Sequence, residues 1–357
     1  MPRLRAFPVF VGRWAEGLKI AVQKASKRRV DRSLVVAFIL LLTFFALAIR
    51  HASKPLQTDE AVVLDLASHL TDYRPNIENL PPNPYKETLY DVPFWFHPPL
   101  LPILMMPFSS PLVSKVITLM VMESTFLLVF LLTRKRFGEK AAVYALGLLV
   151  LNPDLIRVAS FVWCDQYMFF FLFLGLCLYE YDHTSLGLLT NVFSTNAKIV
   201  YPLFSLTFLG RGWREGVKAF TVAALSLIPF WLWSWISTAN PLYLVQTWLD
   251  VGSQFEGTYA AKYFPYFKKW FYLLLVLLVL GLFLKKIDYR KCKDLLPIVI
   301  VSFLVYNHAS WTLLGAIVVL SILFAVLLDR LRMGWKLLLV SVYGVTIIPQ
   351  LFNALLL

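Results

Sequence analysis

The sequence predicts an all-α fold, a bundle of helices that crosses a membrane many times. The first observation behind this fold class is composition. The chain of 357 residues is 59% hydrophobic and only 15% charged, whereas soluble domains carry about 25% charged residues. The second observation is that the apolar residues come in blocks of about 16–22 residues, the length of a helix that crosses a hydrocarbon core. We therefore expect a multi-pass integral membrane protein.

The apolar blocks predict about 11 membrane helices in a single domain that covers residues 33–357. The preceding residues 1–32 form a basic cytoplasmic segment. In that segment Phe10, Trp14 and Leu18 recur every four residues, so it is either an amphipathic helix on the membrane surface or a basic tail that only sets orientation. The expected spans are Ser33–Ile49, Leu112–Leu132, Ala141–Leu151, Gln166–Tyr181, the short pair Leu186–Ala197 and Val200–Leu209, Val217–Ile236, Trp270–Leu284, Leu295–Tyr306, Trp311–Leu328 and Leu337–Leu355.

The basic residues set the expected orientation of these spans. Most of the 34 Lys and Arg residues flank span ends that we place in the cytoplasm, as the positive-inside rule requires. The N-terminus is then cytoplasmic, in the plasma membrane of a prokaryote or the endoplasmic reticulum membrane. Because the net charge of +13 is a topology signal, it does not indicate a nucleic-acid partner. The three cysteines, Cys164, Cys177 and Cys292, are scattered and predict no disulfide framework or metal site.

The long outer connection over residues 50–111 is the expected catalytic loop. Asp59 and Glu60 stand just before an expected amphipathic helix, Ala61–Leu70. One interpretation is structural, since Thr58 is a good N-cap and acids in the first turn suit the helix dipole. The other is that Asp59 is a general base at the membrane interface, where partial desolvation makes a carboxylate more basic.

His97 lies at the far end of this loop, before two prolines that require an extended or turned backbone. The apolar run that follows is broken by Pro102 and Pro107 and is too short to span the membrane. His97 either donates a hydrogen bond to a phosphate or is a structural histidine among interfacial aromatic residues.

Further charged residues are expected at the outer ends of later spans. Asp165 either caps the helix that follows it or faces a polar cavity. Lys198 stands at the tip of the shallow hairpin, where it either meets an anion such as the phosphate of a lipid carrier or extends to the interface. Arg157 and His308 are also placed on the outer face. Since these groups all fall on one side of the bundle, we expect them to converge there.

Five short motifs follow one another along the chain in a characteristic order. They are Asp59-Glu60, His97-Pro98-Pro99-Leu100, Asn152-Pro153 with Asp165, Ala197-Lys198 with Pro202, and His308 with Trp311. Their order and sidedness resemble the GT-C superfamily of polyprenyl-phosphate-sugar-dependent glycosyltransferases, near the dolichyl-phosphate-mannose and aminoarabinose transferases. The residue Cys164 departs from the family pattern.

This resemblance implies transfer of a sugar, a mannose-like hexose, from a polyprenyl or dolichyl phosphate donor, with inversion. The acceptor on the extracytoplasmic face is a glycan, a lipid or a protein. By position, the resemblance implies that Asp59 is the general base, Glu60 its neighbour and Asp165 a second acid. Donor phosphate binding is assigned to Lys198, His97, His308 and Arg157. No cofactor and no metal site are expected; Mg²⁺ or Mn²⁺ is compatible with the pattern but not required by it.

Two other classes of function compete with this interpretation. A transporter or flippase of a lipid-linked or anionic solute would also use outer cations and the intramembrane Glu123. It predicts charged residues along a path on both sides of the membrane midplane, whereas the enzyme predicts clustering on one side. A non-catalytic scaffold leaves the acidic pair and the His-Pro-Pro turn unexplained beyond capping. The sequence contains no Walker loop, HExxH or GxSxG motif.

Overall fold

The computed structural model describes residues 31–82, 91–108, 110–199, 201–247, 250, 289–304 and 313–356. Within these ranges every regular element is a helix, which confirms the all-α class. Four helical stretches are long and apolar enough to cross a membrane: α2 (Arg32–Ala52), α6 (Pro111–Phe137), the α12–α13 stretch Trp213–Thr238, and Met333–Leu351 of α18. The protein is an integral membrane protein.

The predicted number of about 11 spans is not established by the described residues. The span Trp270–Leu284 and the residue His308 lie outside them, as does all but the end of the segment 1–32. Four other predicted spans correspond to helices within a few residues of the expected bounds: α7 (Glu139–Val150), α9 (Cys164–Glu180), α16 (Leu296–Leu304) and α17 (Leu313–Arg330). The division of the chain after residue 32 stays a prediction.

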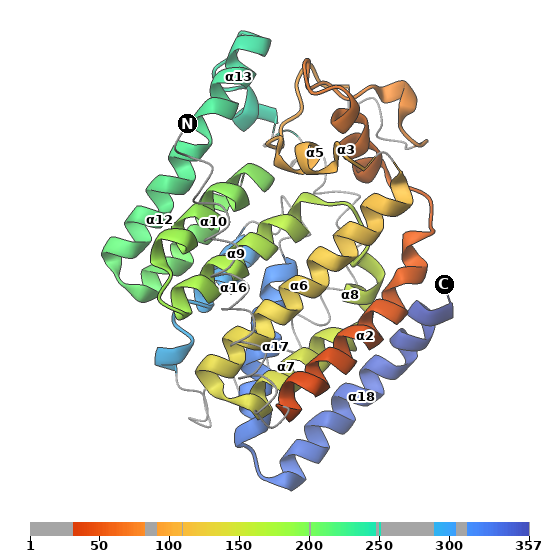
Figure 1. Ribbon diagram of the computed structural model, residues 1–357, viewed down its shortest axis with the longest axis vertical. Helices are drawn as coiled ribbons and strands as arrows, with labels where there is room; N and C mark the ends of the chain where they lie inside the picture. The colour runs from red at the N-terminus through yellow and green to blue at the C-terminus, as the bar shows by residue number, and fades with distance from the viewer. Residues whose placement is uncertain are drawn as a thin grey trace, which may run out of the picture.

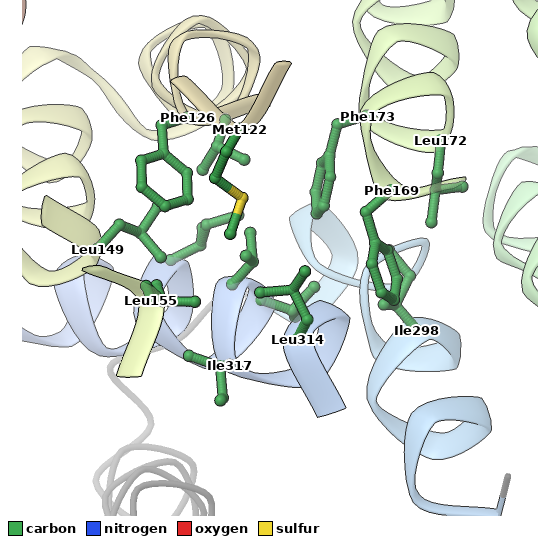
Figure 2. Packing of buried hydrophobic residues seen from close by; sticks show 14 of the residues in the cluster. Met122, Phe126, Leu149, Leu155, Phe169, Leu172, Phe173, Ile298, Leu314 and Ile317 are labelled. Atoms are coloured by element: carbon green, nitrogen blue, oxygen red, sulfur yellow. The ribbon is translucent and has the colours of Figure 1, made fainter. Parts of the chain in front are cut away.

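Helix α17 forms the centre of the bundle. All of its side chains from Leu314 to Leu328 are buried, and an apolar helix that is covered on every side belongs in a core. Figure 2 shows residues of α6, α7, α9 and α16 packing around it, together with Leu155 of α8 (Pro153–Val158). Gly315 allows close packing there, since a Cβ atom would lie 2.3 Å from the Phe169 ring.

Helices α2 and α18 lie along one side of the bundle (Figure 1). Only 22% of the apolar stretch of α2 and 12% of that of α18 are buried. Large apolar side chains that remain exposed on such helices are suited to contact lipid. Helix α2 begins after Asp31, whose carboxylate accepts from the backbone N–H of Ser33 at 3.0 Å, as an N-cap requires.

The shallow hairpin around Lys198 is present in altered form. Helix α10 (Thr184–Ala197) is followed by α11 (Tyr201–Phe204) and the 3₁₀-helix η3 (Ser205–Arg211). Helices α9 and α10 pack very closely, since a Cβ atom on Gly187 would lie 2.3 Å from the Tyr179 ring. Near the other ends of the two helices the Ser194 hydroxyl group donates to the Met168 carbonyl at 2.8 Å, which joins the end of α10 to the start of α9.

The predicted span Val217–Ile236 is divided into α12 (Trp213–Ser226) and α13 (Ile228–Thr238). The division follows from Pro229, which cannot donate a backbone hydrogen bond to the helix before it and is placed in the first turn of α13.

The loop over residues 50–111 forms a cap over one end of the bundle, at the top of Figure 1. It contains α3 (Thr58–Ser68), the 3₁₀-helix η2 (Ile77–Asn79) and α5 (Leu100–Met105). Aromatic rings attach the loop to α13: the ring centroids are 4.9 Å apart for Tyr73 and Trp233 and 5.5 Å apart for Phe94 and Phe230. Tilted and edge-on pairs of this kind add about 0.5–1.5 kcal/mol each beyond their buried area, so the cap is held rigidly over the bundle.

Candidate active site

Glu60 joins the start of α3 to two other parts of the chain. It is fully buried. Its carboxylate accepts from the backbone N–H groups of Gln57 at 2.8 Å and Val162 at 3.0 Å, and Lys115 Nζ lies 3.4 Å away. The expectation that Thr58 is the N-cap is wrong, because Glu60 reaches back to Gln57, which is the N-cap, and the helix begins at Thr58. Burial raises the pKa of Glu60, and these three partners oppose that effect.

Asp59 lies beside Glu60 in the same helical turn but in a different environment. Successive residues of an α-helix point about 100° apart, so the two carboxylates face different surroundings. Asp59 is exposed, whereas Glu60 is not. The charge of Asp59 lies within electrostatic range of the Cys164 thiol at the start of α9. The first turn of α3 therefore divides the acidic pair into one buried and one accessible carboxylate.

Asp165 and Lys198 form a buried ion pair. Both carboxylate oxygens of Asp165 lie 2.6 Å from Lys198 Nζ, and the two residues are 4% and 5% exposed. Charge-assisted hydrogen bonds of this length are the strong ones. The alternative in which Asp165 is an N-cap is wrong, since Trp163 holds that position and Asp165 lies inside the first turn. Asp165 therefore fixes the ammonium group of Lys198 in place.

His97 lies close to this pair. The pKa of His97 is lowered to about 3, first by burial and then by the positive charge of Lys198. Its ring packs against Phe96, with centroids 4.4 Å apart, and its carbonyl accepts from Tyr73 Oη at 2.8 Å. No protein atom in the described ranges bonds His97 Nδ1. His97 is thus a neutral imidazole with one nitrogen left for another partner.

The structure brings Asp165 and Lys198 into contact, with His97 within electrostatic range of Lys198 and Asp59 within electrostatic range of Cys164. The thiol lies within range of the charges of Lys198, Asp165 and Asp59, and Tyr73 lies within range of Cys164. Sequence reasoning did not select Cys164 or Tyr73 for this site. The only available signal for Cys164 was its place directly before Asp165.

Arg157 lies in a second group of charges. Its electrostatic neighbours are Lys54 and Asp154, and Lys54 also lies within range of Arg50 and Lys115. Lys115 is a third residue that the sequence did not select; it is 1% exposed although it lies near the start of the membrane helix α6. No group of three or more metal-ligating side chains occurs in the part of the chain that the structure describes.

The arrangement combines an accessible carboxylate, an immobilised ammonium group and a neutral imidazole at the end of the bundle that the loop over residues 50–111 covers. A fixed cation can stabilise negative charge that develops on a phosphate, and an exposed carboxylate can take a proton from a hydroxyl group.

The comparisons with known proteins bear on the fold. No family model matches the sequence, and no curated protein matches it. The structure is similar to ArnT from Cupriavidus metallidurans bound to undecaprenyl phosphate, with a TM-score of 0.56, 14% sequence identity and coverage of 88% of this chain and 63% of that one. It is also similar to the apo form of the Archaeoglobus fulgidus oligosaccharyltransferase, with a TM-score of 0.55, 14% identity and coverage of 90% of this chain and 55% of that one.

The chain therefore spans less than two thirds of the length of these solved structures. At this level of identity the likeness bears on the path of the backbone and not on the chemistry. The architecture itself is shared over nearly the whole of this chain, and the fold is the one seen in these two solved structures.

Proposed function

We propose that the protein is a glycosyltransferase that moves a sugar from a polyprenyl-phosphate donor to an acceptor at the outer face of the membrane. The observation that carries the proposal is the buried Asp165–Lys198 pair beside the neutral His97 and the accessible Asp59. The structure of ArnT with undecaprenyl phosphate supports a lipid-phosphate donor by analogy of fold.

In the proposed reaction the donor phosphate lies against Lys198 and His97. As the bond between the sugar and the phosphate breaks, negative charge grows on the phosphate, and the fixed ammonium group of Lys198 stabilises it. His97 is neutral and contributes as a hydrogen-bond donor through a ring N–H, not as a cation. No nucleotide is required for this chemistry.

Asp59 is the proposed general base. It takes the proton from the acceptor hydroxyl group as that oxygen attacks the anomeric carbon on the face opposite the phosphate. A single displacement of this kind inverts the anomeric centre and uses one carboxylate, unlike the carboxylate pair of a glycosidase. Asp165 and Glu60 are occupied by buried contacts, so we assign them the positioning of Lys198 and of α3.

The finer points of the proposal rest on the sequence resemblance alone. They are a mannose-like hexose, a dolichyl or polyprenyl carrier, an acceptor that is a glycan, lipid or protein, and phosphate binding by His308 and Arg157. The proposed cytoplasmic N-terminus rests on the distribution of basic residues. His308 lies outside the described residues.

The test uses the purified full chain in lipid nanodiscs with radiolabelled polyprenyl-phosphate sugars and candidate acceptor fractions. The wild type is expected to label one acceptor fraction, and Asp59→Asn is expected to lower the rate at least about a hundredfold, the lower end of general-base contributions. Asp72→Asn is the matched control, since Asp72 is also an exposed acid of the outer loop.

Wild-type turnover in Asp59→Asn would reject Asp59 as the base. Movement of intact donor lipid between leaflets, with no label in any acceptor, would reject the transferase and favour the transporter.

A further inference from the structure

Tyr73 makes two hydrogen bonds to the short stretch of chain that ends in His97. Its hydroxyl group donates to the His97 carbonyl at 2.8 Å, and its own backbone carbonyl accepts from the N–H of Trp95 at 2.8 Å. The Tyr73 side chain is fully buried. Burial raises the pKa of Tyr73, so the hydroxyl group keeps its proton and remains a donor. One residue therefore holds both ends of the stretch that carries the imidazole.

The backbone of Tyr73 has an unfavourable conformation. Its φ is 50°, in the left-handed region that large side chains rarely adopt. Such a conformation persists only where the surrounding contacts over-determine it, and it is frequent at functional sites. The Tyr73 ring is enclosed by the rings of Trp233, Phe94 and Phe230, with centroids 4.9, 5.3 and 6.1 Å away. The aromatic cluster and the two hydrogen bonds together hold this residue in place.

The His97 carbonyl is the point at which the following turn can be held. Pro98 and Pro99 have no backbone N–H groups, and Pro98 restricts His97 to an extended backbone. The Tyr73 hydroxyl group fixes the peptide plane between His97 and Pro98. The His97 ring packs against Phe96, and its buried Nδ1 has no protein partner in the described ranges. The direction of the ring is thus set by the backbone and by packing, not by a hydrogen bond at Nδ1.

We propose that Tyr73 is a positioning residue for His97, and that its hydroxyl group holds the His97–Pro98 peptide so that the imidazole meets the donor phosphate. The part of this inference that concerns the phosphate rests on the proposed function. A hydrogen bond to a reacting group weakens steeply when the donor is misaligned, and small displacements of a positioned group lower the rate of transfer. In this proposal Tyr73 acts only through His97.

The experiment is a double-mutant cycle on the full chain in nanodiscs with a radiolabelled polyprenyl-phosphate sugar. Tyr73→Phe removes the hydroxyl group and keeps the ring in the aromatic cluster. It is expected to lower kcat/KM for the donor about three- to tenfold, the size of one neutral hydrogen bond. In a His97→Gln background the same change should cause no further loss, because its effect passes through the imidazole. Unchanged kcat/KM in Tyr73→Phe, or additive losses in the double variant, would overturn the proposal.

Tyr243→Phe is the matched control. The Tyr243 hydroxyl group donates to the Phe94 carbonyl at 2.8 Å, and its ring packs against the same aromatic cluster, but it does not bond His97. We expect this variant to keep the kcat/KM of the wild type. An equal loss in Tyr243→Phe and Tyr73→Phe would overturn the proposal, since the loss would then follow a general loosening of the cap.

A nuclear magnetic resonance measurement gives a result that does not depend on transfer. The histidine rings of the full chain are labelled with ¹³C, and the His97 signal is identified by its absence from His97→Gln. This signal is expected to move in Tyr73→Phe and to stay in place in Tyr243→Phe. An unmoved signal in Tyr73→Phe would overturn the positioning role. A wild type that transfers no sugar would instead reject the proposed function, and the signal alone would then decide whether Tyr73 sets the orientation of the ring.

Discussion

His97 illustrates how the surroundings of one residue decide its chemistry. A histidine near a phosphate is commonly assumed to be a cation, but here burial and the nearby Lys198 lower its pKa to about 3. The folded protein favours the neutral ring. His97 therefore lowers the free energy of unfolding only as the pH falls from about 6.5, the ordinary pKa of histidine, toward 3. Above that range it neither gains nor loses a proton.

We therefore predict that His97→Gln lowers the transfer rate by the same factor at every pH between 5.5 and 8. The loss should be about tenfold, as for one hydrogen bond to a charged group. The measurement is kcat/KM for the donor across this range in both proteins. If the ratio of wild type to variant changes around pH 6.5, the imidazole titrates and its assignment as a neutral donor is wrong.

The Asp165–Lys198 pair gives a second prediction at this scale. Removal of one member of a buried pair leaves the other charge without compensation and costs about 3–5 kcal/mol. We expect Lys198→Met and Asp165→Asn each to lower the Tm markedly, whereas the double variant loses less than the sum of the two. Thermal unfolding in detergent measures this coupling. Additive losses would show that the two side chains do not depend on each other.

Both single variants should also lose transfer, since Asp165 acts by holding Lys198. The donor KM of Asp165→Glu is a readout specific to that role. The longer side chain of glutamate keeps the negative charge but displaces the ammonium group of Lys198.

At the scale of elements, α3 connects the cap to the bundle. Its first turn is tied by Glu60 to the segment before α9 and to the start of α6. Its following residues Ala61, Val62 and Leu66 are buried in the aromatic cluster of the cap. The position of the accessible Asp59 is therefore set by its neighbour, and the two acids of the pair should respond differently to substitution.

We predict that Glu60→Gln destabilises the protein by about 2–4 kcal/mol, since it leaves Lys115 as a buried and unpaired charge. Asp59→Asn should change the free energy of unfolding by no more than about 0.5 kcal/mol, as for exposed positions in general. Unfolding of the two variants in the same detergent is the measurement. A larger loss of stability in Asp59→Asn than in Glu60→Gln would contradict this division of roles.

At the scale of the whole molecule, charged residues are concentrated at the two ends of an apolar bundle. At the end of the bundle away from the candidate active site, Arg136 at the end of α6 pairs with Asp294 at 2.7 and 2.6 Å and with Glu180 of α9 at 2.9 Å. Arg211 of η3 bonds Glu180 and lies 3.2 Å from Asp294. This network connects α6, α9, η3 and the segment before α16, and so closes the bundle at that end.

Gly210 provides a test of that closure. A Cβ atom at this position would lie 2.5 Å from the Cα atom of Asp294, and backbone cannot move aside at low cost. We expect Gly210→Ala to destabilise by about 1–3 kcal/mol through strain at a packed contact. Gly147→Ala in α7 is the control, since nothing lies within 4 Å of its added Cβ and alanine favours the helix. Equal unfolding temperatures for the two variants would mean that the network tolerates displacement.

The membrane-bundle fold class was predictable from the sequence, while the boundaries of the elements were less so. The placement of the charged groups on the outer face stays a prediction. The division of Val217–Ile236 at Pro229 and the N-cap at Gln57 were missed. The first depends on how the helix packs around a proline, and the second on a side chain that reaches back from Glu60. The count of about 11 spans stays a prediction.

The sequence by itself determined the fold class, because hydropathy and the length of apolar blocks are local properties that need no knowledge of contacts. Only the tertiary structure decided which charges meet. Lys198 reaches Asp165 across 33 residues because α9 and α10 pack side by side. Glu60 reaches Val162 across 102 residues because the cap folds onto the bundle. Burial, which neutralises His97 and conceals Glu60 while leaving Asp59 accessible, depends on that packing and cannot be read from neighbours in the chain.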